Sequence, residues 1–268
     1  MGVYAAVVLA GGAGRRMGGL DKAALPVGGV PMRERVLAEV ADASPRILVG
    51  PGPAPPGVRL TREVPAGGGP VAAIAAGLAL LDADVPAVAL LAADLPLLTR
   101  SAVGKLLHHL GKRSTGTLGE RQTGTLGEPP TGALGDSSAG TPIEPSADAL
   151  GEPPADALGE PPTDALGGPP ADALGGPPTG AVGALDGVCF VDRDGRRQTL
   201  CGVWRPDALR AGLHRLAVER GGELAGAPLR ELLAGLVVHE VTWSGAGPPP
   251  WFDCDTERDV RRAEEWMR

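Results

Sequence analysis

The chain has 268 residues, 43% of them hydrophobic, which is enough to bury the core of one large domain. Its net charge of −7 argues against a general nucleic-acid binder, and the apolar run at 3–10 is too short for a signal peptide or a membrane span. Three widely spaced cysteines without a C-x-x-C pair are typical of reduced thiols, so we expect a cytoplasmic protein that binds neither nucleic acid nor membranes.

Predicted strands and helices alternate in the first part of the chain. The apolar run at 5–10 predicts a buried strand that leads directly into a glycine-rich turn. Such alternation predicts right-handed crossovers and a mostly parallel central sheet with helices on both faces. We therefore expect an α/β fold with three layers in the order α/β/α. Further strands are predicted at 46–50 and 87–96, and helices at 31–42, 69–82 and 100–112.

A low-complexity repeat interrupts the chain at 115–186, where nine consecutive octads such as ADALGEPP and TDALGGPP follow one another. Each octad offers roughly one leucine, and the frequent Pro-Pro pairs break both helices and β-ladders. We interpret the segment as a disordered or polyproline-like insertion, with a small β-solenoid as the alternative. Its eleven acidic residues and one arginine leave a net charge of +3 on the rest of the chain, which is compatible with anionic substrates.

The insertion divides one domain into two parts, residues 1–114 and 187–268. A long surface insertion is tolerated because the entropy of loop closure grows only logarithmically with length. The second part is predicted to end in a helix at 256–267, with Thr256 or Asp255 as its N-cap. Before that helix, the sequence predicts two strands within 187–205, helices at 208–221 and 228–236, and a strand at 237–243.

The stretch VVLAGGAGRRMGGLDKAALPVGG at 7–29 has the composition of an anion-binding loop. Its glycines allow backbone N–H groups to converge on an oxygen atom, because no Cβ stands in the way. The Walker loop is excluded because Gly-Lys-Ser and Gly-Lys-Thr are absent, and the dinucleotide fingerprint fails because Met17 occupies the third glycine position. The candidate anion ligands are Gly11, Gly12, Gly14, Arg15, Arg16 and Lys22.

Asp94 stands at the end of the strand predicted at 87–96. Ligands of parallel sheets bind outside the carboxyl ends of the strands, and the glycine-rich loop follows another strand of the same sheet. We therefore expect Asp94 and the loop to lie together in one site. A basic surface turn without a ligand is the alternative for the loop.

The pattern L-A-G-G-x-x-x-R-M-G-x-x-D-K at 9–22 resembles the signature of the molybdenum cofactor guanylyltransferases, a family of Rossmann-like nucleotidyltransferases. The resemblance implies transfer of GMP from GTP to the phosphate of molybdopterin, with release of pyrophosphate and with Mg²⁺ as cofactor. It further implies molybdoenzyme apo-proteins or their chaperones as partners, and it places nucleotide binding in residues 1–114. The resemblance continues through GGGPVAAIAAGL, AADLP, QTLCGVWRP and DCDTERDV, at 67–78, 92–96, 198–206 and 253–260.

The resemblance also implies roles for individual residues. Arg16 would hold the phosphates, Lys22 would stabilise charge on the triphosphate, and Asp94 would bind Mg²⁺. No strong general base is expected, because the nucleophile is itself a phosphate with a second pKa of about 6. The binding residues implied for nucleotide or pterin are Leu9, Ala10, Gly11, Gly12, Gly14, Arg15, Lys22, Glu63, Gly69, Asp94 and Gln198.

Some residues are compatible with more than one interpretation. Asp255, like Asp253, either completes the Mg²⁺ ligands with Asp94 or, at the start of a helix, merely caps it. Gln198 and its neighbour Arg197 lie either beside the pterin or at a solvated strand end.

The nucleotide is a second open choice. The family often has Glu-Asp ahead of the second glycine-rich loop, whereas this chain has Glu63-Val64, so Glu63 either substitutes for that aspartate or nucleotide affinity is weakened. L-A-G-G favours GTP, because cytidylyl relatives usually carry L-A-A-G. The alternatives are a cytidylyl- or sugar-phosphate nucleotidyltransferase of the same fold, or a catalytically weak nucleotide-binding module, and the octads could serve as an interaction tether.

Overall fold

A seven-stranded sheet forms the centre of the computed structural model, which describes residues 3–11, 21–112, 185–245 and 247–268. The conformation expected for the octads therefore lies outside the described residues, except for Leu185 and Asp186 at their end. The strands are β1 (Ala5–Leu9), β4 (Arg46–Val49), β5 (Val58–Thr61), β6 (Val88–Ala92), β7 (Gly187–Val191), β8 (Arg197–Trp204) and β9 (Val238–Thr242).

The order across the sheet is β5-β4-β1-β6-β8-β7-β9, and the neighbouring strands are parallel except on both sides of β8. This confirms the mostly parallel sheet predicted from the alternation of strands and helices. β6 precedes the octads and β8 follows them, and the two pair antiparallel with Val88 opposite Trp204. Both parts of the chain therefore contribute to one sheet.

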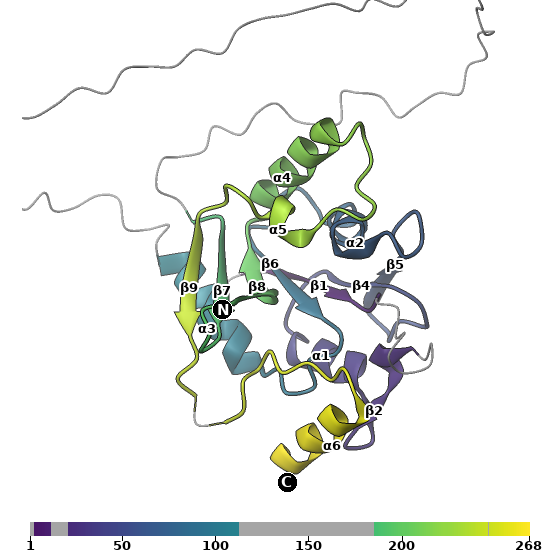
Figure 1. Ribbon diagram of the computed structural model, residues 1–268, viewed down its shortest axis with the longest axis vertical. Coiled ribbons are helices and arrows are strands. Elements are labelled where there is room, and N and C mark those ends of the chain that lie inside the picture. Colours follow the sequence, from purple (N-terminus) through teal and green to yellow (C-terminus); the bar gives the residue numbers. More distant parts are fainter. Residues whose placement is uncertain (1–2, 12–20, 113–184, 246) are drawn as a thin grey trace, which may run out of the picture. The chain divides into compact units, whose positions relative to one another are not determined.

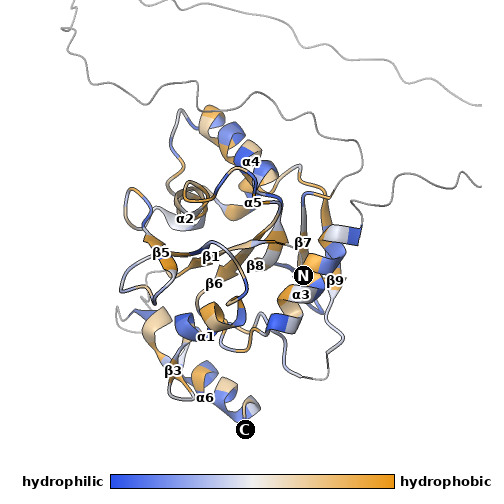
Figure 2. Ribbon diagram, turned by 180° about the vertical axis from the view of Figure 1, so that it is seen from behind, coloured by the Kyte–Doolittle hydropathy of each residue, from blue (hydrophilic) through white to orange (hydrophobic). Residues whose placement is uncertain are grey.

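Helices cover both faces of the sheet, as expected for three layers (Figure 1). Side chains alternate along β1, so that Ala6 and Val8 pack on one face while Val7 and Leu9 pack on the other. Figure 2 shows the apolar colouring concentrated in the strands. One face carries α1 (Met32–Glu39) and α3 (Arg100–Lys112), and the other carries α2 (Gly69–Leu78), α4 (Pro206–Glu219) and α5 (Leu229–Leu232).

The last helix, α6 (Glu257–Trp266), packs against a small two-stranded sheet rather than against the central one. That small sheet consists of β2 (Pro26–Val27) and β3 (Val30–Pro31) and follows the 3₁₀ turn η2 (Lys22–Ala24). Val27, Cys254 and Ala263 meet in a separate buried cluster. This contact brings the segment before α6 close to η2.

Three of these strands, β2, β3 and β5, were not predicted from the sequence, and each omission has a physical cause. β5 is an edge strand whose four residues are all partly or fully exposed, so it lacks the continuous apolar run of a buried strand. The hairpin of β2 and β3 has only two residues in each strand. The helix predicted at 228–236 is also shorter, since α5 ends at Leu232. No helix in the described part of the chain is both long and apolar enough to cross a membrane.

Candidate active site

The carboxyl ends of β1 and β6 bring Gly11, the last described residue before the glycine-rich loop, and Asp94 to one cavity. Leu9 lies opposite Ala92 in the parallel register, and the Ala93 N–H donates to the carbonyl oxygen of Leu9 at 3.0 Å. The Ala10 N–H in turn donates to the carbonyl oxygen of Val49 in β4 at 2.7 Å. The residues that follow β1 and β6 therefore begin at neighbouring positions on the same edge of the sheet.

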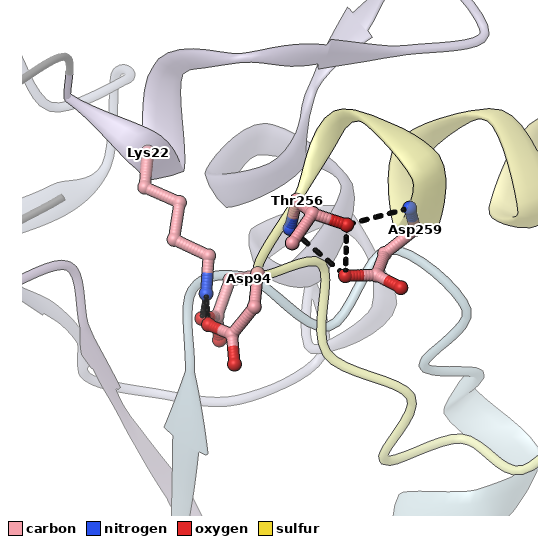
Figure 3. A network of polar contacts seen from close by, with 5 residues as sticks. Lys22, Asp94, Thr256 and Asp259 are labelled. Atoms are coloured by element: carbon pink, nitrogen blue, oxygen red, sulfur yellow. Dashed lines mark hydrogen bonds and ion pairs between the residues drawn. The ribbon is translucent and has the colours of Figure 1, made fainter. Parts of the chain in front are cut away.

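Lys22 joins two acidic residues that are distant in the sequence. Its Nζ donates to Asp94 Oδ2 at 2.5 Å and to Asp255 Oδ1 at 2.6 Å. Figure 3 shows the Lys22 side chain extending from η2 onto the Asp94 carboxylate, beside the start of α6. The side chains of Lys22 and Asp94 are 17% and 22% exposed and that of Asp255 is 47% exposed, so this ion pair is only partly screened by water.

The charge of Lys22 is set by two opposing effects. Burial lowers its pKa, but hydrogen bonds to Asp255 and Asp94 and their negative charges outweigh burial, so the pKa lies above its ordinary value. Asp253, close to the same carboxylates, has a raised pKa, because burial and the charge of Asp255 both oppose its ionisation. At neutral pH the site therefore holds a protonated lysine among acidic groups.

Asp255 can turn its carboxylate to Lys22 because it is not the cap of α6. Thr256 is the N-cap: its side-chain oxygen accepts from the Asp259 N–H at 3.3 Å, and the Thr256 N–H donates to Asp259 Oδ2 at 2.8 Å. This reciprocal capping box selects Thr256 over Asp255 and removes the interpretation of Asp255 as a simple helix cap. Figure 3 shows Thr256 and Asp259 at the first turn of α6.

A cavity of about 510 Å³ opens beside this ion pair. Gly12, Gly14, Arg15 and Arg16 fall outside the described residues, so the cavity is defined by the remaining predicted residues. α2 contributes the start of its first turn, where the N-cap Gly68 offers no side chain to the N–H groups of that turn. Seven of the predicted binding residues line the cavity: Leu9, Ala10, Gly11, Lys22, Glu63, Gly69 and Asp94.

Glu63 lies against both glycine-rich segments. Its Oε1 accepts from the Gly67 N–H at 3.1 Å, and a Cβ added at Gly11 would lie 3.4 Å from the same oxygen. The neighbouring Val64 is 91% exposed, so its side chain points away from the cavity rather than into it. Of these two residues, only Glu63 therefore lines the cavity.

A second cavity of about 460 Å³ adjoins the first. Ala92, Asp94 and Leu200 line both of them. Gln198 belongs to this second cavity and not to the first, and its Nε2 donates to Asp192 Oδ2 at 2.9 Å. Arg197 is half-exposed and pairs with Glu240 at 2.7 Å, and it lines neither cavity.

The second cavity has an aromatic wall that was not predicted from the sequence. Trp251 and Phe252 line it together with Asp253, directly before the Asp255 that binds Lys22. The run WFDCD at 251–255 combines two aromatic rings with two acids, which could have marked it as a ligand-facing segment. A larger cavity of about 730 Å³, lined by residues such as Glu34 and Trp243, contains none of the predicted site residues.

The paired carboxylates are suitable ligands for a hard cation. Asp94 and Asp255 place one oxygen each within 2.6 Å of the same Nζ atom, so both can reach one positive charge. Mg²⁺ in phosphate-handling sites commonly takes one or two protein carboxylates and completes its shell with substrate phosphates and water. The described residues contain no group of three or more His, Cys, Asp or Glu that could hold a metal ion by itself. The donor set thus fits a site shared with a phosphate ligand.

Several solved structures have the same fold. Molybdopterin-guanine dinucleotide biosynthesis protein A from Archaeoglobus fulgidus aligns with a TM-score of 0.55 and 15% identity, over 97% of each chain. The 2-C-methyl-D-erythritol 4-phosphate cytidylyltransferase from Thermus thermophilus gives 0.53 and 19%, over 98% of each chain. Rv0371c from Mycobacterium tuberculosis H37Rv gives 0.56 and 15%, over 98% of this chain and 99% of that one. At these identities the likeness shows the fold alone.

Comparison with protein families extends this result. A search of curated proteins found no match to the chain. The model of the MobA-like NTP transferase domain matches residues 6–150, more than half of the chain, including the glycine-rich loop, Lys22 and Asp94. The chain therefore belongs to the MobA-like NTP transferase domain family and is a nucleotidyltransferase.

Proposed function

We propose that this nucleotidyltransferase transfers GMP from GTP to the phosphate of molybdopterin and releases pyrophosphate. The observation that carries the proposal is the pair of adjoining cavities with Asp94 in their common wall and Lys22 beside it. A transferase that joins two substrates needs two neighbouring sites with charge stabilisation where they meet. The first cavity would hold the nucleotide and the second would hold the acceptor.

The wall of the first cavity suits guanine. The edge of guanine presents an N–H and an amino group side by side, and a carboxylate can accept from both. Glu63 is the carboxylate at this wall, and within the described part of the chain only its Oε1 accepts a hydrogen bond, from the Gly67 N–H. Cytosine lacks this pair of donors, so Glu63 supports GTP over CTP. The N–H groups at the start of α2 add a positive end to the same cavity.

The second cavity suits a planar heterocycle with polar edges. Trp251 and Phe252 offer rings on which such a group can stack, and Gln198 and Asp253 offer hydrogen-bonding atoms. These features support a pterin that carries a phosphate.

The reaction would proceed by direct displacement. An oxygen of the acceptor phosphate forms a bond to the α-phosphorus of GTP, the bond from that phosphorus to the bridging oxygen breaks, and pyrophosphate leaves. Lys22, held protonated, would donate to the triphosphate oxygens as negative charge moves onto the leaving group. Asp94 and Asp255 would hold Mg²⁺, which when bound neutralises the phosphate oxygens around the reacting phosphorus.

The deciding experiment measures pyrophosphate release with each of GTP, CTP, ATP and UTP, with and without molybdopterin. We expect release only with GTP, molybdopterin and Mg²⁺ together, and a loss of at least about 100-fold in the Asp94→Ala variant. Preference for CTP would instead favour a cytidylyltransferase, the second candidate, which is supported by the fold shared with the Thermus thermophilus enzyme. Absence of release in the wild type with every nucleotide and acceptor would leave a nucleotide-binding module.

A further inference from the structure

Arg33 is a charged residue that is almost completely buried. It lies in the first turn of α1 and is 8% exposed, and among the described residues it is the sole polar or charged side chain classed as buried. No role for Arg33 was predicted from the sequence, and Arg33 lines neither of the two cavities of the site. Buried charges are rare in proteins unless they are paired, so the residue that pairs with Arg33 indicates what Arg33 does.

The partner of Arg33 is Asp21, the residue immediately before Lys22. Arg33 Nη1 donates to Asp21 Oδ2 at 2.9 Å. The guanidinium also fills the space above Gly52, where an added Cβ would lie only 2.7 Å from Nη1. The turn containing Gly52 follows β4, so Arg33 is held between the entry to η2 and a turn at the edge of the central sheet.

The carboxylate of Asp21 is available for this pairing because it does not cap η2. Asp21 occupies the N-cap position of η2, but its side chain makes no capping hydrogen bond to that described turn. A backbone bond from the Met32 N–H to the carbonyl oxygen of Leu25 at 3.0 Å ties the other end of η2 to α1. The short turn that carries Lys22 is thereby attached to α1 at both of its ends.

We propose that Arg33 is a positioning residue that fixes Lys22, through Asp21, at the point where the lysine acts on the triphosphate. The inference rests on the proposed role of Lys22 in the transfer reaction. A buried ion pair is a poor source of net stability, because desolvation of the two charges offsets their attraction. It does define the orientation of the backbone on either side, and a catalytic group must be held within about 0.5 Å of its productive position.

A double-mutant cycle between Arg33→Met and Lys22→Met tests the proposal. We expect Arg33→Met to lower kcat for pyrophosphate release by about 10- to 100-fold, because misplacement of a catalytic group by about 1 Å has effects of this size. The KM for the nucleotide should change less than about threefold, since Lys22 acts mainly on charge that develops in the transition state. In the Lys22→Met background, the same Arg33→Met change should lower kcat by less than about twofold.

Two results would overturn the proposal. An equal loss of kcat in both backgrounds would mean that Arg33 supports the fold and does not act through Lys22. A folded Arg33→Met enzyme with unchanged kcat would mean that Lys22 needs no such support. Arg215→Met is the control. Arg215 is another arginine with a hydrogen bond, which it donates to the carbonyl oxygen of Glu231 at 2.7 Å, but this bond joins α4 to α5 and Arg215 lines neither cavity. Its kcat should stay at the wild-type value.

Further variants keep the test decisive if Arg33→Met fails to fold. Asp21→Asn keeps the size of the side chain and removes the charge that holds Arg33, and it should show the same non-additivity with Lys22→Met. The cycle uses whichever nucleoside triphosphate the wild type turns over fastest, so failure of the GTP assignment does not affect it. If the wild type turns over none, Mn²⁺ affinity replaces kcat as the measured quantity, because Lys22 displaced from Asp94 and Asp255 would leave these carboxylates to the cation. Arg33→Met should then tighten Mn²⁺ binding in the wild-type background and leave it unchanged in the Lys22→Met background.

Discussion

At the scale of single residues, the charge balance of the site depends on Lys22. Its ammonium group pairs with two carboxylates that come from different parts of the chain, Asp94 and Asp255. A divalent cation bound by the same carboxylates would have to compete with this ammonium group, because like charges repel strongly at such short range in a partly buried site. We therefore expect the free protein to bind divalent cations weakly, and a triphosphate to draw Lys22 away from the carboxylates.

Replacement of Lys22 should separate these two roles. Lys22→Met should lower kcat for pyrophosphate release by about 10²- to 10³-fold, as loss of a preorganised donor to developing charge does. The same variant should bind Mn²⁺ more tightly than the wild type in the absence of nucleotide, which electron paramagnetic resonance of free Mn²⁺ measures. Lys105→Met is the control, because Lys105 donates to Ser244 at 3.3 Å and lines neither cavity. Equal or weaker Mn²⁺ binding by Lys22→Met would contradict the competition.

At the scale of elements, α6 connects a local capping motif to the chemistry of the site. The capping box of Thr256 and Asp259 fixes where α6 begins, and Asp255 directly precedes it. The helix itself is anchored on the small sheet of β2 and β3, next to η2. The start of the helix therefore sets the position of one of the two carboxylates that meet Lys22.

Loss of this cap should affect both stability and activity. Thr256→Ala should lower the free energy of unfolding by about 1 kcal/mol, measured by urea denaturation, because it removes an N-cap hydrogen bond. It should also lower kcat several-fold, since Asp255 loses its fixed neighbour. Thr99→Ala is the matched control: Thr99 Oγ1 accepts from the Ala102 N–H at 3.2 Å at the start of α3, outside the two cavities. The two variants should lose similar stability, and a similar loss of kcat in both would show that the effect is not specific to α6.

Elements differed in how well the sequence predicted them. The predictions of β1, β4 and β6 are confirmed: β1 and β6 consist of continuous apolar residues, and β4 does so after Arg46, with almost complete burial of these residues. The exposed edge strand β5 and the very short hairpin of β2 and β3 have no such pattern. The hairpin matters most for function, because it is the platform that brings α6 to η2, and no periodicity in the sequence indicates it.

At the scale of the whole molecule, the described strands on either side of the octads form one sheet. β6, before the octads, pairs with β8, after them, and residues from both parts of the chain line the second cavity. The last described residues before the octads belong to α3, which lines neither of the two cavities. The boundaries 115–186 and the role of the octads as a tether stay predictions.

Deletion of residues 115–184, which stops before the buried core residue Leu185, with a short Gly-Ser linker in their place, should therefore leave pyrophosphate release within about twofold of the wild type. The stability of the domain should change little, because closing a shorter loop alters the free energy of unfolding only slightly. Steady-state kinetics and thermal unfolding check the two expectations. If the deletion abolished activity in a protein that still folds, the octads would have to contribute to the reaction itself. Normal kinetics with impaired delivery of the cofactor to molybdoenzymes would support the tether.

The sequence by itself determined the mostly parallel α/β architecture, and it predicted that Gly11 and Lys22 lie in one site with Asp94. Both follow from short-range rules: apolar runs form buried strands, and the carboxyl ends of parallel strands share one edge of the sheet. Only the tertiary structure decided that Asp255 pairs with Lys22, that Gln198 lies in a second cavity, and that Arg33 holds Asp21. Lys22 and Asp255 are 233 positions apart, and their contact depends on how α6 packs on a two-stranded sheet. A local pattern in the sequence contains no information about such packing.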